Sequence, residues 1–374
     1  MQNQARLRAG AVCVMLRAMQ APMKRLVAYV MVGLAVAVGV YALSRRPERI
    51  DRKTRRIVFG TVPLKIIAVA PKQTGAAERL EAAVAAAAGR FAVVNRRMSA
   101  HRPDSTLAQV NAHAATQPVD TGDDRYLSSV LLRSVYWARE TDGAFDVTCG
   151  PLVQLWRRHD ARDVPPDPAA IEAARSRVDS QAIRLSASDQ GGPTVRLDRP
   201  GMRLDLGGIA KGFAIDMAIV ELSDERRLTG GLVDCGGDVR CFGKTVEGDA
   251  WHVGVQSPFD DAVLVTLVMT DRAVATSGNY RRFVTIGGRR YSHIIDPRTG
   301  RPADAVPSVT VIAPNATDAD ALATAVSVLG VAEGLALIER LADTEAMLVT
   351  GTPDDYRMHK SQGFAAFILP ADQD

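Results

Sequence analysis

An uncharged, apolar run near the N-terminus places the strongest limit on how this chain can be organised. Residues 26–44 contain no Asp, Glu, Lys or Arg, and Arg25 and Arg45 border the run directly. A membrane-spanning helix needs about 17–25 apolar residues, whereas the core of a signal peptide needs only about 7–15. The length and the flanking charges therefore favour an export signal that stays as a membrane anchor over a buried core helix.

This run divides the chain into four parts. We expect residues 1–25 to be a basic N-terminal region, residues 26–44 a signal or transmembrane segment, and residues 45–56 a charged linker. Residues 57–374 then form one folded domain, which we expect to lie outside the cytoplasm.

The distribution of charge argues against a nucleic-acid-binding protein. The first 56 residues hold 12 Lys and Arg against 2 Asp and Glu, while the whole chain carries a net charge of +4, so the remainder is mildly acidic. Aromatic residues make up only 5% of the chain, too few for a base-stacking surface. No C-x-x-C motif is present, and Cys235 and Cys241 could form a disulfide or remain buried thiols.

Hydrophobic periodicity predicts helices and strands that alternate irregularly, which favours an α+β fold over a doubly wound sheet. The predicted helices are residues 78–94, 125–140, 210–222, 318–329 and 331–341. The predicted strands are residues 57–70, 308–313 and 346–350, with several short strands between 232 and 283.

The first segment with chemical potential is Asp205-Leu-Gly-Gly-Ile-Ala-Lys-Gly212, a glycine turn between a strand and a helix. Gly207 and Gly208 allow a ligand close to the backbone. The helix start offers amides to a phosphate, and Lys211 adds a cation. A plain strand-to-helix connection has the same pattern.

A second segment opens the helix near residue 318. Asp320 and Thr324 are four residues apart and share one helical face, where a carboxylate and a hydroxyl would suit Mg²⁺. The alternative is a capping box, with Thr317 as the N-cap and Asp320 three residues on.

A third segment places His293 and Asp296 at the end of a strand, where a base and an acceptor could meet a ligand. His293 could equally be a core histidine. Asp146, in the turn-rich stretch 143–151, could accept a hydrogen bond from a nucleobase or a ribose.

Taken together and in this order, the segments resemble the ApbE family of FAD:protein FMN transferases. The resemblance covers about residues 57–350 and rests on six blocks: 98–111, 143–151, 205–212, 236–238, 292–300 and 319–324. It implies a single ApbE-like domain related to the T-fold. It also implies a protein of the bacterial inner membrane whose catalytic domain faces the periplasm.

The resemblance implies a Mg²⁺-dependent enzyme that cleaves FAD. FMN passes to a Thr or Ser hydroxyl of a target flavoprotein as a phosphoester, and AMP leaves. FAD, the target protein and the membrane are therefore the expected partners, and no nucleic acid is expected.

The resemblance also assigns roles to individual residues. Gly208 (through its carbonyl), Asp320 and Thr324 match the metal ligands, and His293, with Asp320, is the expected catalytic residue. The expected FAD-binding residues are Phe59, His101, Ala144, Phe145, Asp146, Asp205, Lys211 and Ile294. Phe59 replaces a family Met, and His101 replaces a Tyr that is common at its position.

Two other functions use the same segments. An FAD pyrophosphatase would pass FMN to water instead of to a protein, and no residue separates the two reactions. A non-catalytic, membrane-anchored FAD-binding protein would need neither the metal ligands nor His293.

Overall fold

The computed structural model describes residues 29–33, 48–122, 125–188, 192–226, 228–278 and 283–370. Residues from Arg49 onward form one compact unit. Most of the predicted membrane segment lies outside the described residues. Its residues 29–33 are helical and exposed.

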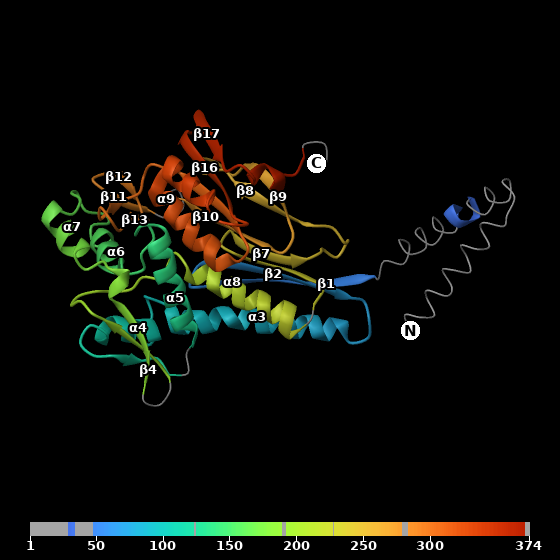
Figure 1. The fold of residues 1–374 in the computed structure, drawn as a ribbon, viewed down its shortest axis with the longest axis horizontal. Helices are drawn as coiled ribbons and strands as arrows, with labels where there is room; N and C mark the ends of the chain where they lie inside the picture. Colours follow the sequence, from blue (N-terminus) through green and yellow to red (C-terminus); the bar gives the residue numbers. More distant parts are fainter. Residues whose placement is uncertain are drawn as a thin grey trace, which may run out of the picture. The chain divides into compact units, whose positions relative to one another are not determined.

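The centre of the compact unit is an antiparallel sheet of eight strands in the order β1-β2-β6-β7-β10-β15-β16-β17 (Figure 1). The bounds of these strands are β1 Arg49–Val58, β2 Val62–Pro71, β6 Gly230–Cys235, β7 Asp238–Gly243, β10 Arg272–Gly278, β15 Ser308–Ala313, β16 Glu345–Thr352 and β17 Asp355–Lys360.

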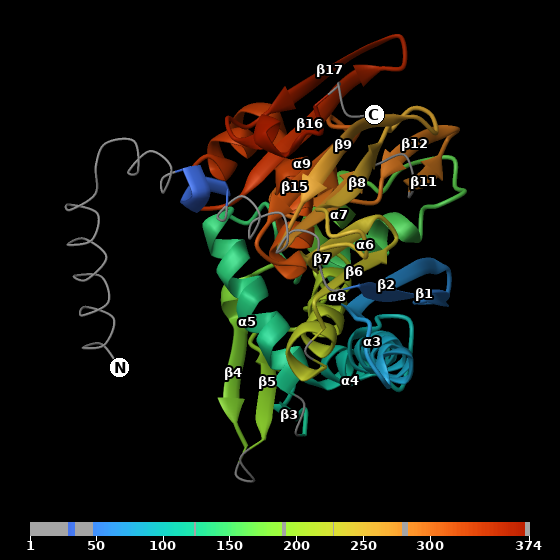
Figure 2. The same ribbon diagram turned by 90° about the vertical axis from the view of Figure 1, so that its right-hand side faces the viewer.

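Smaller sheets surround this one. Figure 2 shows β4 and β5 extending away from the central sheet beside α5. The bounds are β3 Val119–Asp120, β4 Ile183–Ala187, β5 Pro193–Leu197, β8 Trp251–Gln256, β9 Val263–Met269, β11 Phe283–Ile286, β12 Arg289–Ser292, β13 Ile295–Asp296 and β14 Arg301–Pro302.

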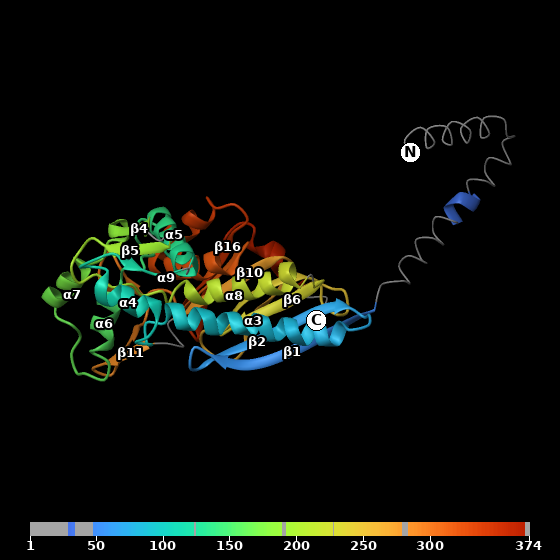
Figure 3. The same ribbon diagram turned by 90° about the horizontal axis from the view of Figure 1, so that it is seen from below.

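Three helices, α3, α8 and α9, pack over one face of the central sheet (Figures 1 and 3). The helix bounds are α3 Ala76–Met98, α4 Thr106–His113, α5 Arg125–Glu140, α6 Gly150–Arg157, α7 Pro168–Arg175, α8 Ala210–Val220 and α9 Ala316–Ile338. Short 3-10 helices span Ser180–Ala182 and Phe364–Phe367, and a π-helical turn spans Glu221–Glu225. This segregation of helices to one face confirms the α+β prediction.

Strand β2 has a nearly continuous apolar sequence because it is buried on both faces of the sheet. Ile66 and Ala68 face the core under the helices, whereas Ile67 and Val69 face the opposite side of the sheet. That opposite side is covered by the β8–β9 hairpin, which contributes Trp251 among others. A strand buried on both faces loses the polar alternation of a half-exposed strand.

Two sequence predictions near the N-terminus are wrong in detail. The predicted linker 45–56 contains most of strand β1, whose ten residues pair with β2. The predicted strand 57–70 is broken by a turn in which Phe59 and Gly60 both have positive φ (50° and 88°). Because β1 is an edge strand rich in Arg, its composition resembles that of a solvated connection.

Further along the chain, the sequence predictions agree better with the structure. The helix predicted at 125–140 coincides with α5. The two predicted helices on either side of residue 330 are the two halves of α9, which breaks at Gly330 (φ 76°). Cys235 and Cys241 are buried free thiols on neighbouring strands, so the disulfide alternative is wrong.

Among the described residues, only α9 is long and apolar enough to span a membrane by length and composition alone. Half of that apolar window is buried inside the unit, and α9 is a core helix.

Candidate active site

The first turn of α8 is held by a glycine contact and by hydrogen bonds within the chain. A Cβ atom at Gly212 would lie 2.1 Å from the carbonyl oxygen of Ala316, so glycine lets α8 approach α9 closely. The amide of Gly212 donates to Oδ2 of Asp320 (3.0 Å), and the amide of Gly207 donates to Oδ1 of Asp205 (2.8 Å). Our expectation that this helix start offers amides to a phosphate is therefore wrong for Gly212, whose amide is already engaged.

The start of α9 is capped by residues other than those expected. Its N-cap is Asn315, whose side chain accepts a hydrogen bond from the amide of Asp318 (2.9 Å). Asp216 of α8 accepts from two backbone amides of this turn, one of them that of Thr317 (2.8 Å). Thr317 is not the N-cap, so the capping-box role of Asp320 is excluded.

Asp320 instead faces α8 and β7. Its Oδ1 lies 3.2 Å from Nζ of Lys211, and the same Nζ contacts Oδ2 of Asp238. Asp238 begins β7, and its Oδ1 accepts a hydrogen bond from the amide of Thr276 on β10 (3.2 Å). Asp320 and Asp238 are 3% and 2% exposed, whereas the side chain of Lys211 is 27% exposed. One partly accessible ammonium thus lies between two buried carboxylates.

The charged groups of this cluster shift one another's pKa values. Burial raises the pKa of Asp320 to about 6, although the ammonium of Lys211 works against the shift. Burial disfavours the charged form of Lys211, but the charges of Asp238 and Asp320 outweigh this effect and raise the pKa of Lys211. At neutral pH the side chain of Lys211 therefore stays an ammonium.

The predicted metal ligands lie next to this cluster. A Cβ atom at Gly208 would lie only 2.9 Å from Oγ1 of Thr324, so the Gly208 backbone and the Thr324 hydroxyl are neighbours. Asp320 and Thr324 share one face of α9. Within the described ranges no three His, Cys, Asp or Glu side chains form a metal-binding group. One carboxylate, one hydroxyl and one carbonyl nevertheless fit Mg²⁺, which keeps several waters and binds substrate phosphates.

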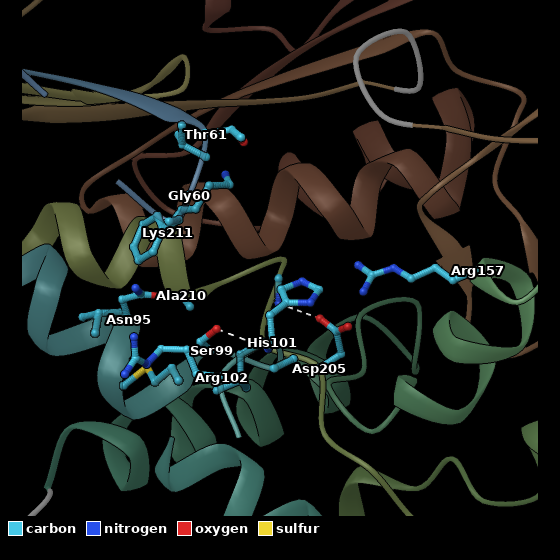
Figure 4. Close-up of a pocket in the computed structure, with 17 residues that line it drawn as sticks. Gly60, Thr61, Asn95, Ser99, His101, Arg102, Arg157, Asp205, Ala210 and Lys211 are labelled. Carbon is cyan, nitrogen blue, oxygen red and sulfur yellow. Dashed lines mark hydrogen bonds between the residues drawn. The ribbon is translucent and has the colours of Figure 1, made fainter. Parts of the chain in front are cut away.

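A cavity of about 560 Å³ opens beside Lys211 (Figure 4). It brings together four of the predicted FAD-binding residues: Phe59, His101, Asp205 and Lys211. The other lining residues are Gly60, Thr61, Val62, Val94, Asn95, Met98, Ser99, Ala100, Arg102, Arg157, Leu206, Gly207 and Ala210. The lining combines apolar, polar and cationic groups, which suits a ligand with both a ring system and phosphates.

Sequence reasoning missed two charged residues of this region. Arg157, the last residue of α6, reaches toward the cavity from the side (Figure 4). Asp238 closes the block 236–238 of the family resemblance, but no role was assigned to it, although it contacts Lys211. The local pattern does not show what either side chain contacts, because each reaches the site through tertiary packing.

Four predicted FAD-binding residues do not line the cavity. Ala144 and Phe145 are buried, and Phe145 packs in the main core. Asp146 accepts hydrogen bonds from Thr148 (2.7 Å and 2.6 Å) and from the amide of Ser180 (3.0 Å). Its carboxylate therefore holds its own loop together, and burial raises its pKa.

Ile294 is engaged in the same way. Its amide donates to the hydroxyl of Ser292 (3.0 Å), and its carbonyl accepts from the amide of Ala303 (2.9 Å). Its backbone groups thus already have partners within the chain.

His293 lies between β12 and β13, and it is exposed. In the part of the chain that the structure describes, the cavity is lined without it. It is thus not a core histidine.

Comparisons with known proteins show the family to which the chain belongs. A sequence profile described as the ApbE family matches residues 61–348. The chain is similar to the FAD:protein FMN transferase of Treponema pallidum, with 41% identity over 280 residues, covering 71% of this chain and 75% of the relative. The protein of the same name from Vibrio cholerae is 33% identical over 280 residues, covering 74% and 81%.

Solved structures give the same result. The flavin transferase ApbE from Vibrio cholerae matches with a TM-score of 0.73 and 29% identity, covering 85% of this chain and 99% of that one. The ApbE protein from Thermotoga maritima matches with a TM-score of 0.74 and 29% identity, covering 86% and 100%.

Proposed function

The chain belongs to the ApbE family, and we propose that it transfers FMN from FAD to a threonine or serine hydroxyl of a target flavoprotein. One observation carries the proposal. Lys211 lines a cavity suited to a nucleotide and at the same time touches Asp320, the side chain best placed to bind a metal. Lys211 therefore links the proposed substrate-binding cavity to the proposed metal site.

In the proposed reaction, the hydroxyl oxygen of the acceptor attacks the phosphorus atom of the FMN half of FAD. The bond from that phosphorus to the bridging oxygen breaks, and AMP leaves with the bridging oxygen. His293 takes the proton of the attacking hydroxyl, since histidine is the usual base near neutral pH.

The remaining residues of the site bind and orient FAD. Phe59 and His101 offer apolar and aromatic surface to the ring system, and Lys211 and Arg157 place positive charge beside the diphosphate. Asp320, Thr324 and the carbonyl of Gly208 would hold Mg²⁺, which offsets the charge that develops on the phosphates and the leaving group.

We further propose that the apolar run 26–44 anchors the protein in the bacterial inner membrane, with the catalytic unit in the periplasm. The support is the length of the run and the basic residues beside it.

The test is incubation of the purified protein with FAD, Mg²⁺ and a threonine-bearing acceptor protein, followed by mass spectrometry of the acceptor and by quantification of AMP and free FMN. Transfer gives an acceptor that carries FMN and one AMP for each FMN attached. Release of FMN and AMP without a modified acceptor would identify an FAD pyrophosphatase instead. FAD recovered intact would show a binding protein.

A further inference from the structure

The proposed metal site already has a positively charged neighbour, the ammonium of Lys211. The ammonium of Lys211 lies 3.2 Å from Oδ1 of Asp320 and also contacts Asp238. In the described ranges no other Lys or Arg pairs with either carboxylate. Both carboxylates are nearly inaccessible, so the position that a metal ion would neutralise is neutralised in part by Lys211.

Buried carboxylates need a positive partner, since an unpaired buried charge is costly. A divalent cation bound to Asp320 would share that carboxylate with the ammonium of Lys211, and the two positive charges would repel each other. A metal ion can therefore bind the FAD-free protein in one of two ways. Either Lys211 moves away from Asp320, or the metal ion and the ammonium stay close despite their repulsion.

The side chain of Lys211 has room to move away from Asp320, into the cavity that it lines. Its side chain is 27% exposed and lines the cavity beside Asp205 and Ala210. A diphosphate in that cavity would offer the ammonium new oxygen partners. Asp238 could keep its contact with Lys211 meanwhile, because its other oxygen is fixed by the amide of Thr276.

We propose that Lys211 acts as an internal competitor for the metal at Asp320 and so makes metal binding depend on FAD. This inference rests on the proposed function. Without FAD, the ammonium holds the metal affinity low. With FAD bound, the diphosphate draws the ammonium away from Asp320 and adds negative charge to the site. By linkage, FAD then strengthens metal binding by the same factor by which the metal strengthens FAD binding.

The test measures the affinity of the full chain for Mn²⁺, used as a spectroscopic substitute for Mg²⁺, by electron paramagnetic resonance with and without FAD and without any acceptor. We expect Lys211→Met to bind Mn²⁺ at least about tenfold more tightly than the wild type in the absence of FAD. We also expect FAD to improve the affinity of this variant much less than that of the wild type. Lys53→Met removes one exposed cation from β1 and should leave both affinities unchanged.

A second pair of variants tests the cluster itself. Asp238→Asn removes the other partner of Lys211, so the ammonium should bind Asp320 more firmly and weaken Mn²⁺ binding. The double variant Lys211→Met with Asp238→Asn keeps the buried charges nearer to balance. It should again bind Mn²⁺ more tightly than the wild type, even if Lys211→Met alone folds poorly.

A Mn²⁺ affinity that is unchanged or weaker in Lys211→Met and in the double variant, while the wild type binds Mn²⁺ with FAD, would overturn this inference alone. A wild type that binds no Mn²⁺ even with FAD would overturn the metal site of the proposed function, and this inference with it.

Discussion

The ammonium of Lys211 lies 3.2 Å from Oδ1 of Asp320, although the two residues are 109 positions apart in the chain. The other oxygen of Asp320 accepts a hydrogen bond from the amide of Gly212, one residue after the lysine. A single carboxylate of α9 therefore fixes both the backbone and the side chain of the first turn of α8. A substitution of Asp320 will therefore disturb Lys211, the cavity that Lys211 lines and the proposed metal site together.

The first prediction concerns pH. The pKa of Asp320 is raised to about 6, so below that pH the carboxyl group is mostly protonated and cannot ligate a metal. We expect the affinity for Mn²⁺ to fall by about tenfold for each pH unit below about 6 and to level off above it. Titrations at several pH values on both sides of 6 check this. A profile that stays flat down to the ordinary range of an aspartate, about 4, would contradict it.

The second prediction concerns Gly208→Ala. The new Cβ would lie 2.9 Å from Oγ1 of Thr324 and 3.4 Å from Cε2 of Phe145, so the hydroxyl must move. We expect weaker Mn²⁺ binding with the fold retained, as judged by circular dichroism. Gly89→Ala is the matched control, since Gly89 is exposed in α3 and a Cβ atom added there would have no atom within 4 Å. That variant should gain about 0.5–1 kcal/mol of stability and bind Mn²⁺ normally. Equal Mn²⁺ affinities in the two variants would remove Gly208 from the metal site.

A segment could be predicted from the sequence when it has one exposed and one buried face, because its apolar residues then recur at a regular spacing. A segment without that contrast was harder to predict. Helix α5 repeats its apolar stripe every three to four residues, and its predicted and observed limits agree. Strand β1 lies at an edge of the sheet and exposes Arg55 and Arg56, so its apolar signal is weak. A charged edge strand and a linker have the same composition, and only pairing with β2 distinguishes them.

The site shows a similar division. That Asp320 and Thr324 share one helical face was predictable, because their spacing on one helix is a local property. Asp238 and Arg157 were not, since the β6–β7 hairpin and the end of α6 reach the site only in the folded chain. Asp146 was predicted as an FAD contact, yet its carboxylate is engaged by Thr148 and Ser180. A sequence pattern shows which groups are available but not which of them the fold uses for itself.

The third prediction concerns truncation. A chain that begins at Arg49 keeps all of β1 and should fold and bind FAD. A chain that begins at residue 57 loses eight of the ten residues that pair with β2, and it exposes the outer edge of β2. We expect the shorter chain to melt at a lower temperature and to aggregate more readily. Equal melting temperatures for the two chains would show that residues 49–56 act as a linker after all.

The last prediction separates catalysis from binding at two exposed histidines. His293 lies in the turn after β12 and outside the cavity lining, whereas His101 lines the cavity. If His293 is the base, His293→Asn keeps the size of the side chain but cannot accept a proton near neutral pH. Transfer of FMN at saturating FAD should then slow by roughly 10²–10⁴, with FAD affinity unchanged. His101→Asn should show the opposite pattern, with weaker FAD binding and nearly normal turnover at saturation. Fluorescence titration of FAD and single-turnover transfer measure the two quantities on each variant. Weak FAD binding with normal saturated turnover in His293→Asn would make His293 a binding residue and leave the base to be found elsewhere.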